Sequence, residues 1–238
     1  MHIECNLQMA ATRPFMSWAD RTFNPWLSWS RSLGCVGGET SGLYPDAEIG
    51  DARMAKSWNA NAQAFALKHD GRRQRVFAGP WCHALAANVD EAQRARFWSL
   101  VRATPALDWL VLASGDVGRP ATLPADWGYG YHNVWVGAKA TGPESARFAL
   151  AQLKGVAARL RFLVATPMRN DFGDLDLSGV DWVIVGADTS DLVPADWVMS
   201  VKLQAMCDGV PVWMESPHSA RLGGLESAPY AVQEHPRL

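Results

Sequence analysis

Residues 134–165 read "VWVGAKATGPESARFALAQLKGVAARLRFLVA", and the fold class can be inferred by working outward from them. Two short apolar runs, Val134–Ala138 and Arg161–Ala165, enclose a longer amphipathic stretch, Pro143–Val156. Short runs rich in Val, Leu, Trp and Phe are typical of buried strands in parallel sheets, and a proline at the start of the longer stretch favours a helix beginning there. The stretch therefore predicts a right-handed strand–helix–strand unit with parallel strands.

The same alternation continues on both sides of this unit. Five further strands are predicted at Arg21–Trp26, Arg75–Ala78, Trp109–Ala113, Trp182–Gly186 and Val212–Met214. Three further helices are predicted at Ile49–His69, Asp90–Ala103 and Pro194–Cys207. Seven strands with intervening helices predict an α/β protein whose parallel sheet curls into a partial or full (βα) barrel, with an open doubly wound sheet as the alternative.

Length and charge restrict the class of protein. At 238 residues the chain suits one domain, because single cores grow to roughly 250 residues before they split. We expect a barrel over about 20–218, an N-terminal extension over 1–19 and a loosely held tail over 219–238. The net charge of −2 argues against broad electrostatic capture of nucleic acid. There is no apolar run of about 18 residues and no signal-peptide pattern, so we expect a cytoplasmic protein without membrane contact.

Polar residues follow the predicted strands, at the edge where parallel barrels carry their sites. The candidate pocket residues are Lys139, Asp116, Asp188, Glu215 and Arg169. The candidate ligand-binding residues are Asn24, Trp26, Thr166 and Thr189. A lysine buried in a barrel mouth can form a Schiff base, with a nearby carboxylate as its acid–base partner. The alternative is that Lys139 neutralises carboxylates at the rim.

Several segments carry a family resemblance. "LPADWGYGYHNVWVGAKA" (123–140), "GVDWVIVGADTS" (179–190) and "PADWVMSVKLQAMCDGVPVWM" (194–214) resemble a phage and bacterial family of unknown function whose members look like small radical-SAM proteins. The resemblance runs in order from about Thr22 to Trp213. It implies a radical-SAM-like partial barrel. It also implies a [4Fe–4S] cluster that binds S-adenosylmethionine and, if the protein is phage-encoded, a place in the bacterial host cytoplasm.

The cluster loop of that family departs from its pattern here. The family reads roughly Asn-Pro-x-x-Gly-Cys and then Cys-x-x-Cys, whereas "RTFNPWLSWSRSLGCVGGET" (21–40) holds one cysteine, Cys35. The first ligand position falls on Ser28 or Trp29 and the third on Gly38. Because such clusters are held by several thiolates, the resemblance implies a divergent member that has lost both cluster and cofactor.

A different metal is the next possibility. Cys35 with Cys82, His83, Glu215 and His218 would offer mixed ligands for zinc on the loops after the strands. These residues lack the C-x₂₋₄-C or H-x₃₋₅-H spacing of zinc sites, so we expect no metal. The four cysteines, at positions 5, 35, 82 and 207, are instead typical of reduced thiols.

Three functions are possible. The first is a non-catalytic scaffold that pairs with an intact relative or with another phage or host protein. Exposed tryptophans among the twelve would favour it, although Asp-Trp pairs such as Asp181-Trp182 are more simply interpreted as packing between helices and sheet. The second is a repurposed enzyme or a binder of a nucleotide or S-adenosylmethionine at the barrel mouth. An intact radical enzyme is the third and would need thiolates from elsewhere in the chain.

Overall fold

A computed structural model of the chain gives the structure of residues 17–23, 25, 52–78, 91–113, 122–186, 193–215 and 233–236. The chain divides into two compact units. One comprises residues 1–112 with 122–134, and the other comprises residues 113–121 with 135–238. Within the described ranges, no helix combines the length and apolar character needed to cross a membrane.

The described residues form seven strands whose order in the sheet follows the sequence. They are β1 (Arg21–Phe23), β2 (Gln74–Ala78), β3 (Leu107–Leu112), β4 (Val134–Ala140), β5 (Leu160–Ala165), β6 (Trp182–Val185) and β7 (Val212–Met214). β1 to β3 pair in parallel, and so do β4 to β7. A doubly wound sheet reverses its strand order at a switch point, so that alternative is wrong. The α/β prediction of a partial (βα) barrel is confirmed.

Five helices lie in the described ranges, and they include α2 (Ala52–Ala60) and α3 (Ala62–Lys68). The single helix predicted over Ile49–His69 is therefore interrupted. At the interruption, Asn61 donates its side-chain amide to the carbonyl oxygen of Ser57 at 2.8 Å. The Ser57 carbonyl oxygen also accepts the Asn61 backbone N–H at 3.0 Å, so Asn61, with φ −93° and ψ 9°, leaves helical geometry without losing this hydrogen bond. The predicted first strand is also too long, because Pro25 lies in a bend beyond β1.

The first unit combines an aromatic core with buried ion pairs. Trp109 of β3 meets Phe23 of β1 and Phe97 of α4 (Glu91–Ala103) edge to face, at centroid distances of 5.4 and 5.7 Å. The Arg73 Nε donates to the buried Asp108 Oδ1 at 2.7 Å. This charge network lies at the amino ends of β2 and β3, the end that usually serves stability in barrels.

A second ion pair ties the start of β1 to the turn before β2. Arg72 holds both carboxylate oxygens of Asp20 at 2.6 Å, and the Arg75 backbone N–H donates to the same carboxylate at 2.8 Å. Burial alone would raise the pKa of Asp20, but these hydrogen bonds and the charges of Arg72 and Arg75 lower it below the ordinary 3.8. Such a carboxylate stabilises the fold while it is ionised.

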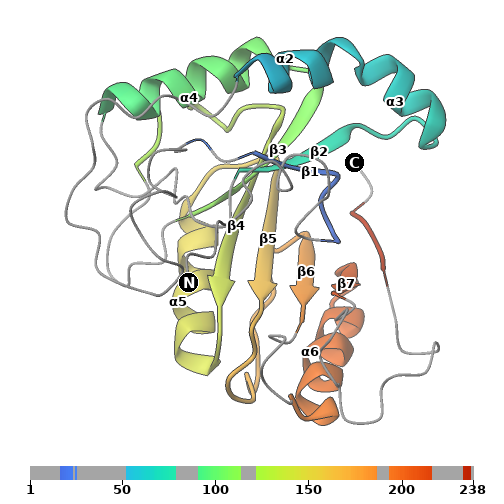
Figure 1. Cartoon of the computed structure of the whole chain (residues 1–238). Helices are drawn as coiled ribbons and strands as arrows, with labels where there is room; N and C mark the ends of the chain where they lie inside the picture. Colours follow the sequence, from blue (N-terminus) through green and yellow to red (C-terminus); the bar gives the residue numbers. More distant parts are fainter. Residues whose placement is uncertain are drawn as a thin grey trace, which may run out of the picture. The chain divides into compact units, whose positions relative to one another are not determined.

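The second unit carries α5 (Pro143–Gly155) against β5 and α6 (Ala195–Cys207) against β6 and β7 (Figure 1). The Arg161 Nε donates to the carbonyl oxygens of Leu153 and Val156 at 2.9 and 3.0 Å, so the Arg161 side of β5 faces α5. The opposite face carries an aromatic cluster, which we define as Trp135, Phe162, Trp182 and Trp213. Alternation along the strands separates these two faces.

The tryptophans of the described residues pack inside the units. Buried indoles occur at positions 18, 98, 109, 127, 135, 182 and 213, and half-buried indoles at 58 and 197. The interpretation of the Asp-Trp pairs as packing motifs is confirmed for Trp109, Trp127 and Trp182. The exposed tryptophan surface that would have favoured a docking function is therefore not found among the described residues.

Candidate functional site

The carboxyl ends of β4 to β7 bring three polar side chains to one face of the sheet. Lys139 pairs with Val164, and Val164 with Ile184. Ile184 in turn pairs with Trp213. Paired residues of parallel strands share a face, and so do residues two apart along one strand. Thr166, Gly186 and Glu215 each follow one of these residues by two positions, so they lie on the same face as Lys139, opposite α5.

Gly186 allows the Glu215 and Thr166 side chains to approach the end of β6 closely. A Cβ atom built on Gly186 would lie 3.0 Å from the Glu215 Cβ, 3.1 Å from its Oε2 and 3.1 Å from the Thr166 Oγ1. These distances are shorter than ordinary van der Waals contact, so any larger residue would displace the Glu215 side chain. The glycine therefore lets a carboxylate and a hydroxyl group sit on either side of one backbone position.

Backbone hydrogen bonds hold this arrangement. The Glu215 N–H donates to the Val185 carbonyl oxygen at 2.8 Å, and the Gly186 N–H donates to the Ala165 carbonyl oxygen at 3.3 Å. Thr166 and Glu215 are half-buried, whereas Lys139 is exposed. We call Lys139, Thr166, Gly186 and Glu215 the carboxyl-edge cluster. It offers an ammonium group, a hydroxyl group and a carboxylate on one face, which suits a small ligand that carries both acceptors and donors.

Two sequence expectations meet the structure here. The Lys139 side chain is exposed, whereas Schiff-base lysines are commonly activated by burial, and both roles of Lys139 stay predictions. Arg169 is anchored beside the start of α5, where its N–H donates to the Thr141 carbonyl oxygen at 2.8 Å. Its side chain is exposed on the segment that follows β5, so it is available from solvent.

The other predicted site residues lie outside the described ranges. They are Asn24, Trp26, Cys35, Cys82, His83, Asp116, Asp188, Thr189 and His218. Their roles stay predictions. Sequence reasoning had placed Lys139, Thr166 and Glu215 at the same edge of the sheet, but it gave Gly186 no role. The signal for Gly186 was its position directly after the buried run Trp182–Val185, where a glycine often marks close backbone approach.

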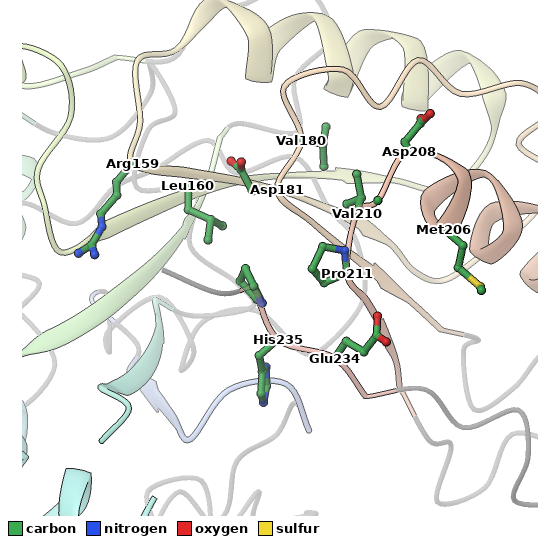
Figure 2. Close-up of a pocket in the computed structure, with 12 residues that line it drawn as sticks. Arg159, Leu160, Val180, Asp181, Met206, Asp208, Val210, Pro211, Glu234 and His235 are labelled. Atoms are coloured by element: carbon green, nitrogen blue, oxygen red, sulfur yellow. The ribbon is translucent and has the colours of Figure 1, made fainter. Parts of the chain in front are cut away.

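A hollow lies at the opposite ends of these strands. Its volume is about 920 Å³, and Figure 2 shows Leu160, Val180, Val210 and Pro211 among its lining residues. Leu160 begins β5, and Val210 and Pro211 precede β7, so the hollow opens at the amino ends of the strands. We call it the amino-end hollow. It is separate from the carboxyl-edge cluster because the two lie at different ends of the same strands.

The C-terminal segment forms one wall of this hollow. Gln233 bridges Trp213 in the antiparallel sense, and the Glu234 N–H donates to the Val212 carbonyl oxygen at 2.9 Å. The Trp182 indole donates to the Glu234 carbonyl oxygen at 2.9 Å. His235 stacks on Trp213 at a centroid distance of 4.5 Å. Residues 233–236, part of the tail that we expected to be loosely held, thus contact β7.

Of the four cysteines, Cys207 is the one that lies in the described residues. Cys35 is the one cysteine in residues 21–40. Cys207 is exposed at the C-terminal end of α6, which leads to the amino end of β7 and away from the carboxyl edge. Within the described ranges, no three His, Cys, Asp or Glu side chains come together as metal ligands.

Comparison with known proteins gives a family. The model of a family described as "Protein of unknown function (DUF5131)" matches residues 14–217. No curated protein and no solved structure matches the chain. The resemblance to a family of unknown function is thereby confirmed over most of the chain. The radical-SAM part of that resemblance, the phage origin and the divergence of this member stay predictions.

Proposed function

This chain belongs to the DUF5131 family of proteins of unknown function, and we propose that it is a cluster-less member that binds a small polar ligand at the carboxyl-edge cluster. The observation that carries the proposal is the approach of Glu215 and Thr166 around Gly186, with Lys139 on the same face. A carboxylate accepts hydrogen bonds from ribose hydroxyls or an amine, and an ammonium group attracts a phosphate or carboxylate. A nucleotide or S-adenosylmethionine offers both kinds of group.

Binding rather than catalysis is the simpler function for this edge. Lys139 is exposed and lacks the burial that activates nucleophilic lysines, so attraction of an anion is the simpler role for its ammonium group. The backbone of the half-buried Glu215 is held by its hydrogen bond to Val185, so the strand fixes the face of the sheet from which its side chain projects. Such preorganisation lowers the entropy cost of binding.

A thermal-shift panel of nucleotides and S-adenosylmethionine tests this function. A ligand at 100 times its Kd adds about 2.7 kcal/mol, which at about 2–4 °C per kcal/mol for a chain of this size is a shift of about 5–10 °C. We expect such a shift in the wild-type protein. Glu215→Gln is expected to weaken binding about tenfold, because a charge-assisted hydrogen bond becomes a neutral one.

Gly186→Ala is the structural arm of the same test. Its added Cβ would push Glu215 away, so the ligand-induced shift is expected to disappear. Gly155→Ala is the matched control, because a Cβ at Gly155 meets no atom within 4 Å. A panel in which no member shifts the wild-type protein rules out this function. An unchanged shift in Gly186→Ala would separate binding from the carboxyl-edge cluster.

Metal analysis tests the cluster-less part of the proposal. We expect protein purified without oxygen and offered iron and sulfide to contain neither iron nor zinc, because residues 21–40 hold one thiol. About four irons per chain, with an absorption band at about 400 nm from thiolate-bound iron, would contradict the cluster-less proposal. Stoichiometric zinc would instead point to Cys35, Cys82, His83 and His218.

A second function, binding of a partner protein, is favoured by a different observation. Leu203 and Met206 of α6 are 53% and 59% exposed, and they lie three residues apart on one helix face. Isolated exposed apolar residues are common, but an adjacent pair beside a hollow is typical of contact surfaces. We propose that this surface, rather than the tryptophans, supports a scaffold role with an intact relative or another protein.

A further inference from the structure

The amino-end hollow has a mixed polar and apolar lining and several carboxylates at its rim. Leu160, Val180, Val210 and Pro211 contribute apolar atoms, and Met206 of α6 stands at one side. Figure 2 shows Met206 and Arg159 at opposite sides of the hollow, with Val180, Val210 and Pro211 between them. Leu160, Val180 and Val210 are nearly fully buried, so Met206 is the apolar side chain of this lining that another molecule can contact most widely.

The charges at the rim indicate the kind of partner. Asp181, Asp208 and Glu234 are three exposed carboxylates, against one guanidinium from Arg159. In Figure 2, Asp208 and Glu234 lie on either side of Val210 and Pro211. Carboxylates around an apolar surface attract lysine or arginine residues that flank apolar anchors, and they disfavour acidic partners.

The apolar surface continues from the hollow onto α6. Met206 belongs to both, because it lines the hollow and is 59% exposed. Leu203 lies one helical turn earlier on the same face of α6. Two exposed anchors separated by a helical turn match the spacing of apolar residues on an amphipathic helix of a partner.

We propose that the amino-end hollow and the Leu203–Met206 face of α6 form a docking surface for a basic amphipathic segment of a partner protein. The inference rests on the partner-protein function and gives it a surface. It is independent of ligand binding at the carboxyl-edge cluster, which lies at the other ends of the strands. The apolar anchors supply affinity, and Asp208 and Glu234 supply charge selectivity.

The test uses the full chain and two fluorescent 14-residue peptides. Both carry leucines at helical spacing, and one has lysines where the other has glutamates. Fluorescence anisotropy is expected to show binding of the lysine peptide, weakened by added salt, and at least about tenfold weaker binding of the glutamate peptide. Equal binding of both peptides, or binding of neither, would overturn the inference.

Variants locate the binding on the surface. The double variant Leu203→Ser with Met206→Ser is expected to weaken lysine-peptide binding about tenfold, and Asp208→Lys about fivefold. Leu67→Ser, at an 82% exposed site on α3, and Glu144→Lys, at an exposed site in the first turn of α5, are matched controls that should bind like wild type. Each affected side chain is exposed, so the variants should melt as the wild type does.

A purified family member that carries the three cluster cysteines separates the docking surface from the partner-protein function on which that surface rests. If that relative co-elutes with the wild-type chain but not with the Leu203→Ser, Met206→Ser variant, both the partner function and its surface are supported. Co-elution that the variant leaves unchanged overturns the docking surface and leaves the partner function standing. Absence of both co-elution and peptide binding overturns both.

Discussion

Asp108→Ala is expected to destabilise the protein by about 3 kcal/mol, because it removes the buried partner of a charge network. The Asp108 side chain is 3% exposed and accepts the Arg73 Nε at 2.7 Å. Arg73 also donates to the carbonyl oxygens of Pro105 and Leu107, so it connects the turn before β3 with the turn before β2. Without Asp108, the Arg73 guanidinium keeps only these carbonyl acceptors and loses its counter-charge.

Arg75 increases the cost of this change. Burial and the charge of Arg72 lower the pKa of Arg75 to about 10, while the charges of Asp20 and Asp108 oppose that shift. Removing Asp108 therefore leaves a buried cation with less compensation. Arg73 is itself about one-third exposed, and for this reason we expect the lower end of the range of about 3–5 kcal/mol for broken buried pairs.

Urea denaturation and thermal melting measure the effect of Asp108→Ala. At about 2–4 °C per kcal/mol, Tm is expected to fall by about 6–12 °C. Asp126→Ala is the matched control, because it removes an exposed carboxylate paired with Arg102 at 3.1 Å and should lower the stability much less. Equal losses for the two variants would show that Asp108 contributes no more than a surface ion pair.

Trp182→Ala is expected to cost about 3–5 kcal/mol, the largest effect in the second unit. Trp182 is fully buried at the centre of the aromatic cluster. Its ring lies 6.1 Å from the rings of Trp135 and Phe162 and 6.4 Å from that of Trp213. Truncation removes these contacts and leaves a cavity that the neighbouring strands cannot close. It also removes the indole donor that holds the Glu234 carbonyl oxygen.

Two further variants separate packing from hydrogen bonding at this position. Trp182→Phe keeps most of the ring but loses the N–H, so it should cost less than Trp182→Ala and should still release Glu234. Faster backbone hydrogen exchange at Glu234 reports that release. Tyr129→Ala, at a 96% exposed aromatic, is the control and should stay within about 0.5 kcal/mol of wild type. A Trp182→Ala protein as stable as the Tyr129→Ala protein would exclude a structural role for the cluster.

Local pattern was enough to predict most strands. Val212–Met214 agrees with β7 at both ends, and the predicted Arg161–Ala165 differs from β5 by one residue. These runs are short, apolar and bounded by polar or turn residues, so burial leaves few alternatives. The helix predicted over Ile49–His69 was less accurate, because hydrophobic periodicity does not show where a single residue, here Asn61, departs from helical backbone geometry.

The candidate site was predicted in part for the same reason. Parallel strands bring their carboxyl ends to one edge, so a polar residue just beyond a predicted strand falls near others of its kind. Thr166 and Glu215 follow that rule. Lys139 lies inside β4 rather than after it, and its exposure could not be derived from a run of otherwise buried residues.

The sequence by itself determined the alternation of strands and helices, the placement of Thr166 and Glu215 at one edge, and the wide spacing of the four cysteines. These features depend on local periodicity and on residue type, which are visible along the chain. Only the tertiary structure decided that Gly186 separates two polar side chains, that Arg73 meets Asp108, and that Trp182 binds Glu234. The two residues of each pair lie 29 to 52 positions apart in the sequence: Gly186–Glu215, Arg73–Asp108 and Trp182–Glu234. Contacts at such separations form only when the strands pack, because no local preference specifies which distant residue will be the partner.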